Sequence, residues 1–327
     1  MSGTERQPDA PLVCLVGPTG VGKTETAVRL AEALGGEIIG ADSRQVYRQM
    51  DVGTAKPTPE ERARVPHHLI DVVDPDRPFS AGEFVRLADQ AIAGIRARGR
   101  VPLVVGGTGL YVRALLDGIW HAPEQNPALR AALAGVRERR GGAFMHRFLT
   151  RLDPQTAGTL HENDRHKVDR AVEIALQTGR PSSALRRAHG FPGRYPAVRI
   201  GLTRPRAELY DRINSRVEQM ISAGWLDEAR ALVNKGYRAD APGMNAVGYR
   251  ELVRVLDGEW TMDQAAQAIQ KATRNYAKRQ FTWFNKDDRL KWFDVSCVSS
   301  ADLSASLLSM CNQAGVIRVN VSICQTP

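Results

Sequence analysis

The sequence lacks several features that would narrow its class at once. It has only four cysteines in 327 residues, and Cys14, Cys297, Cys311 and Cys324 show no metal-ligand spacing. No apolar run approaches the roughly 20 residues of a membrane-spanning helix. These absences exclude a disulfide-rich scaffold, a cysteine-based metal site and a helical membrane protein. Cys14 lies in an apolar run, so we interpret it as a small buried thiol.

Signals for export and for repetition are also missing. Residues 1–10 are polar and contain no apolar segment of a secretory leader, so we expect a cytoplasmic protein. No internal repeat is visible, which excludes a solenoid. The length allows two or three domains. No segment points to an obligate protein partner.

Positive charge is abundant but unevenly placed. The net charge is +9, and residues 1–120 carry 14 Lys and Arg against 15 Asp and Glu, a net of −1. Residues 121–200 carry 14 against 7, a net of +7, and residues 201–327 carry 17 against 14, a net of +3. A basic module on a neutral core favours a polyanionic partner such as nucleic acid. An Arg-rich solvated surface is the alternative, and charge alone does not separate the two.

The strongest local motif is a phosphate-binding loop. The stretch GPTGVGKT follows an apolar strand-like run and opens an amphipathic helix, and it fits G-x-x-x-x-G-K-[ST] at every fixed position. In this motif backbone N–H groups and the lysine bind phosphates, and the final hydroxyl holds Mg²⁺. We therefore predict Mg²⁺ as cofactor, with Thr24 as its ligand. The predicted phosphate-binding residues are Gly17, Pro18, Thr19, Gly20, Val21, Gly22, Lys23 and Thr24.

Apolar periodicity predicts an α/β fold, a P-loop NTPase-like doubly wound parallel sheet with a helical insertion domain. Strands are predicted at 13–16, 36–42, 67–75, 101–106 and 195–203, and helices at 24–34, 80–99, 110–116, 206–224 and 261–284. Ser80 and Glu83 fit a capping box. The predicted domains are a tail at 1–10, a catalytic core at 11–120 and 195–298, a helical Arg-rich insertion at 121–194, and a variable C-terminal end at 299–327, where the sequence shows no distinctive feature.

Strand ends supply the first candidate catalytic residues. Asp42 is the strongest acid at the end of a predicted strand, and the strand VPLVV ends in Gly106, Gly107 and Thr108 rather than in an acid. Because carboxyl ends of parallel strands line the ligand crevice, Asp42 and Thr108 are expected to face the bound phosphates. The residues alone leave two hypotheses: a small-molecule kinase, or a transferase whose phosphates form the leaving group. For Asp42 the alternative role is a turn carboxylate, and for Thr108 it is a helix cap.

Two helical segments carry arginine and lysine in informative positions. Arg216 falls on the apolar stripe of Leu209, Ile213 and Met220, where an arginine either snorkels or meets an anion, and Arg212 is its rival. The segment 271–286 holds five basic residues, no acid and interleaved aromatics, which suits nucleic acid. A solvated basic face with core aromatics is the alternative.

Six segments together resemble the tRNA dimethylallyltransferases, also called tRNA isopentenyltransferases. They are GPTGVGKT, ADSRQVYRQMDVGTAKP, PHHLIDVVDP, PLVVGGTGLYVRALLDG, NAVGYREL and ATRNYAKRQFTWF, and the similarity runs from about Leu12 to Trp292. The resemblance implies transfer of a dimethylallyl group from dimethylallyl diphosphate to N6 of the adenosine 3′ of the anticodon, with pyrophosphate released. It implies a diphosphate at the phosphate loop, Asp42 as base, Thr108 as assistant and Arg216 as a diphosphate ligand.

The resemblance also implies how tRNA is held, and that the helical Arg-rich insertion at 121–194 binds it. A channel through the core would admit the anticodon stem-loop from one side and the donor from the other, with the target base flipped out of its stack. The implied tRNA-binding residues are Asp42, Ser43, Arg44, Gln45, Thr108, Arg130, His166, Lys167, Arg170, Asn245, Gly248, Tyr249, Arg250, Arg274, Lys278, Arg279 and Gln280. Outside enzymes, an ATP-dependent nucleic-acid-binding factor is the alternative.

Overall fold

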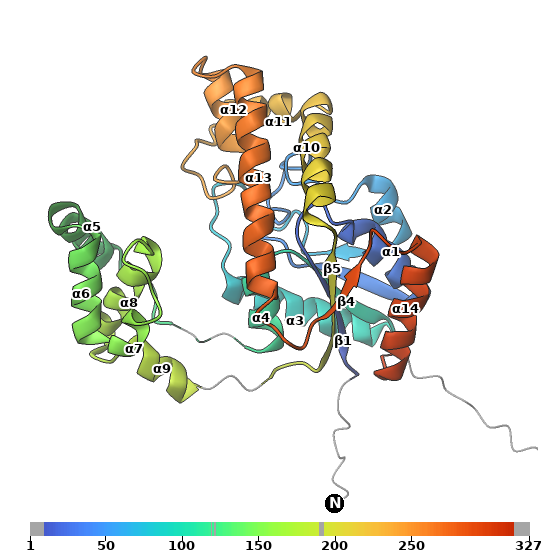
Figure 1. Cartoon of the computed structure of the whole chain (residues 1–327), viewed down its shortest axis with the longest axis horizontal. Helices are drawn as coiled ribbons and strands as arrows, with labels where there is room; N and C mark the ends of the chain where they lie inside the picture. The colour runs from blue at the N-terminus through green and yellow to red at the C-terminus, as the bar shows by residue number, and fades with distance from the viewer. Residues whose placement is uncertain (1–9, 119, 121, 190–192, 317–327) are drawn as a thin grey trace, which may run out of the picture. The chain divides into compact units, whose positions relative to one another are not determined.

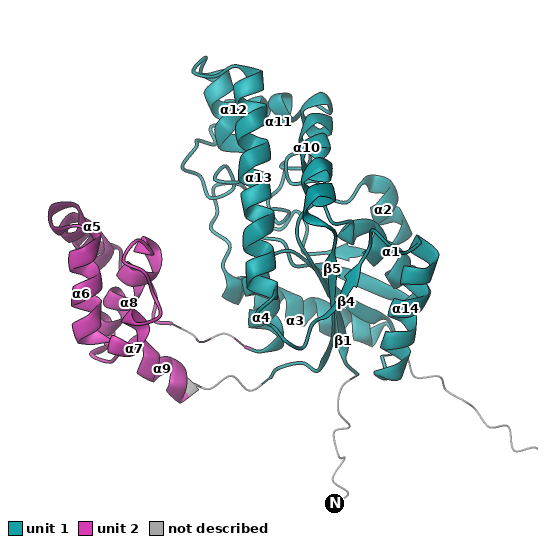
Figure 2. Cartoon of the chain, in the orientation of Figure 1, with its two compact units in different colours: residues 1–117, 193–327 teal, residues 118–192 magenta. Residues whose placement is uncertain are grey.

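The chain forms two units in the computed structural model, which describes residues 10–118, 120, 122–189 and 193–316. A core unit comprises Met1–Asp117 and Gly193–Pro327, and an insertion unit comprises Gly118–Pro192 (Figure 2). The sequence placed the insertion at 121–194. Each unit has its own hydrophobic core, so we describe them separately.

The core unit is built on a six-stranded sheet whose neighbouring strands are all parallel, in the order β3-β2-β4-β1-β5-β6. The strands are β1 (Leu12–Val16), β2 (Gly36–Gly40), β3 (His67–His68), β4 (Val101–Gly106), β5 (Ala197–Thr203) and β6 (Lys291–Asp294). Both β1 and β2 are buried along their whole length, as expected of central strands covered on two faces. The predicted doubly wound parallel sheet is confirmed.

Alternation along β1 builds the two layers around the sheet. Val13 and Leu15 join a cluster with α1 (Lys23–Leu34) and α14 (Ser300–Gln313). Leu12, Cys14 and Val16 join the opposite cluster with α3 (Ala81–Ala97) and α4 (Gly109–Leu116). Burial raises the pKa of the Cys14 thiol to about 12, so the interpretation of an inert buried cysteine agrees with its position.

Four helices form a second layer that extends beyond the sheet (Figure 1). The long helices α10 (Arg206–Ser222) and α13 (Met262–Phe284) pack side by side, and α11 (Trp225–Asn234) and α12 (Tyr249–Leu256) lie toward the far end of α13. Trp225 and Tyr249, both almost fully buried, anchor a core shared by these helices. Tyr47 and Met50, from the segment after β2, belong to the same core. The loop after β2 is therefore packed against the helical layer.

The insertion unit is helical, as the periodicity predicted. Its helices are α5 (Pro127–Arg140), α6 (Gly142–Leu152), α7 (Pro154–Ala157), α8 (Arg165–Thr178) and α9 (Ser182–His189). Leu133, Met145, Leu149 and Val168 lie in its core. The fully buried Asp153 accepts hydrogen bonds from the backbone N–H groups of Thr156 and Ser183, which fixes the starts of α7 and α9.

Two predicted features differ from the structure, and one helix forms where none was specified. The apolar run at 67–75 forms only β3, because Leu69 and Asp71 adopt positive φ angles of 63° and 59° that end the strand. Ser80 caps α3 by accepting from Glu83 N–H at 3.1 Å, but no return bond from the Glu83 side chain is found among the described residues. After Ser299, where the sequence shows no distinctive feature, the chain forms α14, which buries Leu303 and Leu307.

Three short helices and one strand were not predicted. They are α2 (Pro59–Arg64), α11, α12 and β6. Among the residues that the structure describes, no helix has the length and apolar character needed to cross a membrane.

Candidate active site

The phosphate loop joins β1 to α1 in the geometry that the motif requires. Gly22 occupies the N-cap of α1 with φ of 109°, and Gly17 has φ of 155° and lies so close to β5 that a Cβ would be 2.7 Å from the Leu202 carbonyl oxygen. Both positions therefore need glycine. Lys23 Nζ donates to the Gly17 and Pro18 carbonyls at 2.9 and 2.8 Å. The lysine is thus folded back over its own loop.

The electrostatics of this loop favour an anion. Burial lowers the pKa of the Lys23 ammonium to about 8, opposed by the negative charge of Asp42 and reinforced by the positive charge of Arg216. Burial also lowers the pKa of the Arg216 guanidinium. In the described part of the chain, Arg216 has no hydrogen bond or ion pair, whereas Arg212 Nε donates to the Gly20 carbonyl at 3.0 Å. Arg216 is therefore the cation left available to a ligand, and Arg212 supports the loop.

Asp42 lies two residues after Gly40, the last residue of β2, and therefore at the carboxyl end of that strand. Its Oδ1 accepts hydrogen bonds from Arg44 N–H at 2.8 Å and Gln45 N–H at 3.4 Å. Within the described residues Oδ2 has no hydrogen-bond partner. The turn role and the role of a free acceptor are thus divided between the two oxygens of one carboxylate.

Thr108 joins the ends of the neighbouring strands β2 and β4. Its Oγ1 accepts from Ser43 N–H at 2.9 Å, and its own N–H donates to Ala41 O at 3.1 Å. Although Thr108 is the N-cap residue of α4, its hydroxyl makes no capping bond. Burial, together with the charge of Asp42, raises the pKa of Tyr276 on α13 to about 12. The structure therefore brings Thr108 and Asp42 to the same edge of the sheet.

Residues of the phosphate loop, Asp42, Arg216 and Tyr276 surround one cavity of about 1020 Å³ in the core unit, and the residues that line it do not include Thr108. The phosphate loop, Asp42 and Arg216 line it, together with basic and amide side chains of three further segments. The predicted site residues among its lining are Thr19, Gly20, Gly22, Lys23, Thr24, Asp42, Arg44, Gln45, Asn245, Arg216, Arg250, Arg279 and Gln280. The phosphate loop, a carboxylate acceptor and several cations therefore line the same cavity.

Comparison with known proteins now identifies the family. The family model described as IPP transferase matches residues 45–287. The chain belongs to the IPP transferase family. It is 50% identical to a tRNA dimethylallyltransferase 2 of Geotalea uraniireducens over 86% of this chain and 92% of that protein, and 51% identical to a tRNA dimethylallyltransferase of Symbiobacterium thermophilum over 88% and 90%.

Solved structures of the family have the same fold. A tRNA isopentenylpyrophosphate transferase from Bacillus halodurans superposes with a TM-score of 0.70 at 40% identity, covering 94% of this chain and 98% of that one. A eukaryotic dimethylallyltransferase solved while acting on tRNA gives 0.77 at 25% identity, covering 91% and 77%. The resemblance inferred from the sequence is confirmed, the chain is an enzyme of the transferase class, and the kinase hypothesis loses its support.

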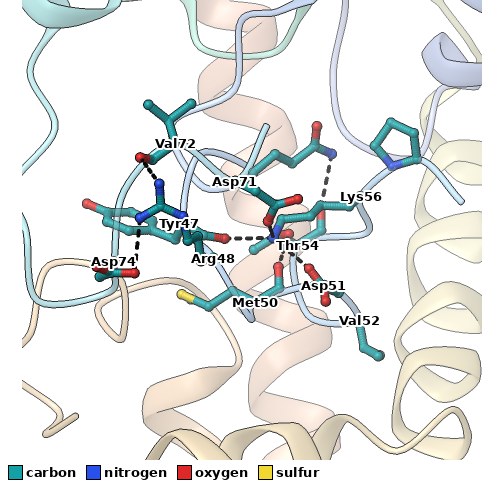
Figure 3. A network of polar contacts seen from close by, with 12 residues as sticks. Tyr47, Arg48, Met50, Asp51, Val52, Thr54, Lys56, Asp71, Val72 and Asp74 are labelled. Atoms are coloured by element: carbon teal, nitrogen blue, oxygen red, sulfur yellow. Dashed lines mark hydrogen bonds and ion pairs between the residues drawn. The ribbon is translucent and has the colours of Figure 1, made fainter. Parts of the chain in front are cut away.

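Within this family fold, a buried lysine holds the loop that follows Asp42 (Figure 3). Lys56, whose side chain is 2% exposed, donates from Nζ to Tyr47 O at 2.6 Å and to the carboxylates of Asp51 and Asp71 at 2.6 and 2.5 Å. Gln45 Nε2 donates to the two carbonyls that precede this lysine, those of residues 54 and 55. The position of the Gln45 side chain therefore depends on the loop that Lys56 holds in place.

A glutamate on α11 holds the same loop from the other side. The Glu228 carboxylate accepts the N–H groups of Asp51, Val52 and Gly53 at 2.7, 2.8 and 3.1 Å. It also accepts the Tyr249 hydroxyl at 2.6 Å. Our sequence analysis missed Lys56 and Glu228. Glu228 could have been noticed, because it lies beside the apolar stripe of α11 as Arg216 does on that of α10.

Three predicted tRNA-binding residues are occupied in the core. Tyr249 is fully buried and bonded to Glu228, and a Cβ on Gly248 would lie 2.0 Å from the Trp225 ring. Gln280 is 5% exposed, and both atoms of its amide bond backbone groups. The structure shows all three supporting the site, and their direct tRNA contacts stay predictions. Asn245 and Arg250 are exposed and line the cavity, so their tRNA contacts stay predictions.

The predicted basic face of α13 is only partly free. Lys278 and Arg279 are exposed, whereas Arg274 donates to Asn214 Oδ1 at 2.5 Å and packs over the Tyr210 ring. Arg274 therefore also ties α13 to α10.

The predicted residues of the insertion unit divide in the same way. His166 and Lys167 are exposed on α8. Arg170 contacts the buried Glu173 carboxylate at 2.8 Å, and Arg130 approaches it at 3.8 Å. Whether these four residues meet tRNA stays a prediction.

Proposed function

We propose that this enzyme transfers a dimethylallyl group from dimethylallyl diphosphate to N6 of the adenosine immediately 3′ of the anticodon of tRNA, releasing pyrophosphate. The observation that carries the proposal is that a phosphate loop and a carboxylate with an unused oxygen line the same cavity of about 1020 Å³. A leaving diphosphate and an accepting amine need these two features side by side. Because the substrate would be tRNA, we place the enzyme in the cytoplasm.

The donor would lie with its diphosphate on the loop. The N-terminus of α1, Lys23 and Arg216 supply positive charge where the allylic C–O bond breaks and its electron pair passes to the diphosphate. A second cavity of about 50 Å³ adjoins Lys23 and Asp42 and is walled by Ile38, Ile70 and Val105. One water molecule needs about 10–15 Å³ of such volume, so this cavity has room for about four water molecules. A space of this size suits one prenyl unit better than the base and ribose of a nucleotide.

The acceptor amine would lose its proton to Asp42. The lone pair of an exocyclic adenine amine is delocalised into the ring, so the amine needs an acceptor for its proton as the C–N bond forms. Oδ2 of Asp42 is available for this, while Oδ1 stays bonded to Arg44 N–H. Thr108, whose Oγ1 accepts the Ser43 N–H, would assist at the same amine. One C–N bond forms, one C–O bond breaks, and the proton ends on the carboxylate.

Mg²⁺ is part of the proposal, with Thr24 as its protein ligand. The Thr24 hydroxyl lines the cavity and makes no hydrogen bond within the described residues. The described residues contain no cluster of three or more His, Cys, Asp or Glu that could hold a metal, so the diphosphate oxygens and water would complete the shell, as is common for Mg²⁺. When bound, the ion would neutralise charge on the leaving group.

The RNA would reach the cavity with the target adenosine flipped out of its stack. The exposed cations Arg250, Lys278 and Arg279 and the neighbouring Arg44 could meet its phosphates. Cations around the proposed site of the target adenosine are consistent with a polyanionic acceptor.

The test is mass spectrometry of an unmodified anticodon stem-loop incubated with the protein, Mg²⁺ and dimethylallyl diphosphate, beside a reaction that contains ATP instead. We expect a prenyl mass gain on one adenosine in the first reaction and no ATP consumption in the second. ATP hydrolysis without prenylation would overturn the proposal.

The role of Asp42 is tested with Asp42→Asn, which keeps an oxygen for the Arg44 N–H but is not a base. We expect turnover to fall by about 10²–10⁴-fold with donor binding retained. Loss of donor binding with turnover intact would contradict the assignment of the base.

A further inference from the structure

Gln280 connects the two loops on which the proposed reactants would sit. It lies on α13 and is 5% exposed. Its Oε1 accepts the N–H of Thr19, in the phosphate loop, at 2.8 Å. Its Nε2 donates to the carbonyl of Gly107, in the turn that carries Thr108, at 3.0 Å. A single side-chain amide therefore spans the donor side and the acceptor side.

The sheet itself does not hold these loops together. The pairing of β1 with β4 ends at Val16 and Gly106, and both loops begin at the next residue. Among the described residues, no other side chain bonds to both loops. Beyond the strand ends, Gln280 is therefore the side chain that links the two loops among the described residues.

The chemistry of the two contacts demands an amide. Thr19 offers a donor and Gly107 an acceptor, so the bridging side chain must accept at one atom and donate at the other. A glutamate would place a carboxylate oxygen against the Gly107 carbonyl. The steric fit is equally narrow, because a Cβ on Gly107 would lie 2.1 Å from Gln280 Nε2.

We propose that Gln280 is a positioning residue that sets the distance between the prenyl donor and the accepting amine. This inference rests on the proposed function. Although Gln280 lines the cavity, both atoms of its amide are bonded to Thr19 and Gly107, so it would act through these two residues. Because it follows directly after the exposed Lys278 and Arg279, it also ties the proposed RNA-facing helix to the phosphate loop. The role is an alternative to the direct tRNA contact expected from the sequence.

The first experiment compares Gln280→Glu with Gln267→Glu, the same change at an exposed position of α13. We measure the single-turnover rate of prenylation at saturating stem-loop RNA and dimethylallyl diphosphate, and separately the Kd of each substrate. For Gln280→Glu we expect a rate about 10- to 100-fold lower with the RNA Kd within about two-fold of wild type, because a misplacement near 1 Å costs this much. Gln267→Glu should match wild type.

Direct tRNA contact would give the opposite pattern. The RNA Kd would rise and the rate at saturation would be unchanged, and that result would overturn the inference. The wild-type reaction serves as the reference: if wild type itself transfers no prenyl group, the proposed function fails, whereas a normal wild type beside a normal Gln280→Glu refutes only the role of Gln280.

A second experiment tests the contact between Gln280 and Gly107 by changing Gly107. Gly107→Ala should slow single turnover because its methyl group displaces the Gln280 amide. In a Gln280→Ala background this clash is absent, so adding Gly107→Ala should cost less than about two-fold further. Additive losses in the double variant would overturn the inference. Thermal unfolding of each variant separates a loss of rate from a loss of folded protein.

Discussion

Glu228 offers a sharp test of how the wall of the cavity is built. Its carboxylate accepts three successive backbone N–H groups, from Asp51, Val52 and Gly53, and the Tyr249 hydroxyl. Glu228→Ala removes all four contacts at once. Because Gln45 donates to the carbonyls of residues 54 and 55 in the same loop, the change should spread to a predicted tRNA-contacting residue.

The expected loss of stability in Glu228→Ala depends on which of the four donor groups water can reach. The N–H of Asp51 lies in an exposed contact and can be rehydrated, whereas those of Val52 and Gly53 are part-buried and Tyr249 is fully buried. A buried group left without a partner costs about 1–3 kcal/mol. Three such groups with partial relaxation give about 2–4 kcal/mol of lost stability for the loop. Glu228→Gln, which keeps acceptor oxygen but loses the charge, should lose about half of that.

Amide hydrogen exchange followed by mass spectrometry measures this loss locally. For a peptide that covers residues 51–57 we expect protection to fall by about thirty-fold or more in Glu228→Ala, since each 1.4 kcal/mol corresponds to about tenfold. The KM for stem-loop RNA should rise, and the Kd for dimethylallyl diphosphate should change little. Protection within about two-fold of wild type would show that the loop is held by other contacts and would refute the reasoning.

Four further predictions concern charge and cavity size. Because burial lowers the pKa of Lys23 from the ordinary lysine value of 10.5 to about 8, binding of diphosphate should take up a proton between these two pH values, measured by calorimetry in buffers of different ionisation enthalpy; binding without proton uptake contradicts this. The Arg98 guanidinium lowers the pKa of Glu37 from 4.5 to about 2, so stability should be lost as pH falls through this window, and urea unfolding of Glu37→Gln should lack that acid dependence. Ile70→Ala should enlarge the small cavity and allow prenylation with geranyl diphosphate, detected as a larger mass gain; continued rejection of that donor would show that Ile70 does not limit its length. Lys278→Ala should reduce the slope of log K against log salt for stem-loop binding by about 0.7–0.9, and an unchanged slope would remove Lys278 from the RNA contacts.

Local patterns were enough for most of the fold. The apolar strands around β1 and the amphipathic helices α1, α10 and α13 carry their period in the sequence. β6 escaped notice because it has four residues and is exposed at both ends. α14 is held by Leu303 and Leu307, which pack toward α1, and a helix of this length gains most of its stability from tertiary contacts rather than from propensity.

The residues of the site also fall into two groups, those that local patterns indicate and those that act over long sequence separations. The phosphate loop was found because its residues are contiguous, and Asp42 and Thr108 because parallel strands end at one edge. The supports were not found because they act across the chain: Glu228 reaches Asp51 over 177 residues and Gln280 reaches Thr19 over 261. A single sequence holds no local signal for such contacts.

Asp42 shows why the two interpretations offered by the sequence did not exclude each other. A carboxylate has two oxygens, and here the turn uses Oδ1 for the N–H groups of Arg44 and Gln45 while Oδ2 remains without a partner among the described residues. The turn bonds fix the direction of the free oxygen, so the structural role supports the chemical one. If Asp42 is the base that we propose, an oxygen held in this way needs no reorganisation when the amine arrives, which is the condition under which a positioned acceptor is most effective. Lys56 and Glu228 hold the loop that follows this turn, so they would also keep the proposed base in place.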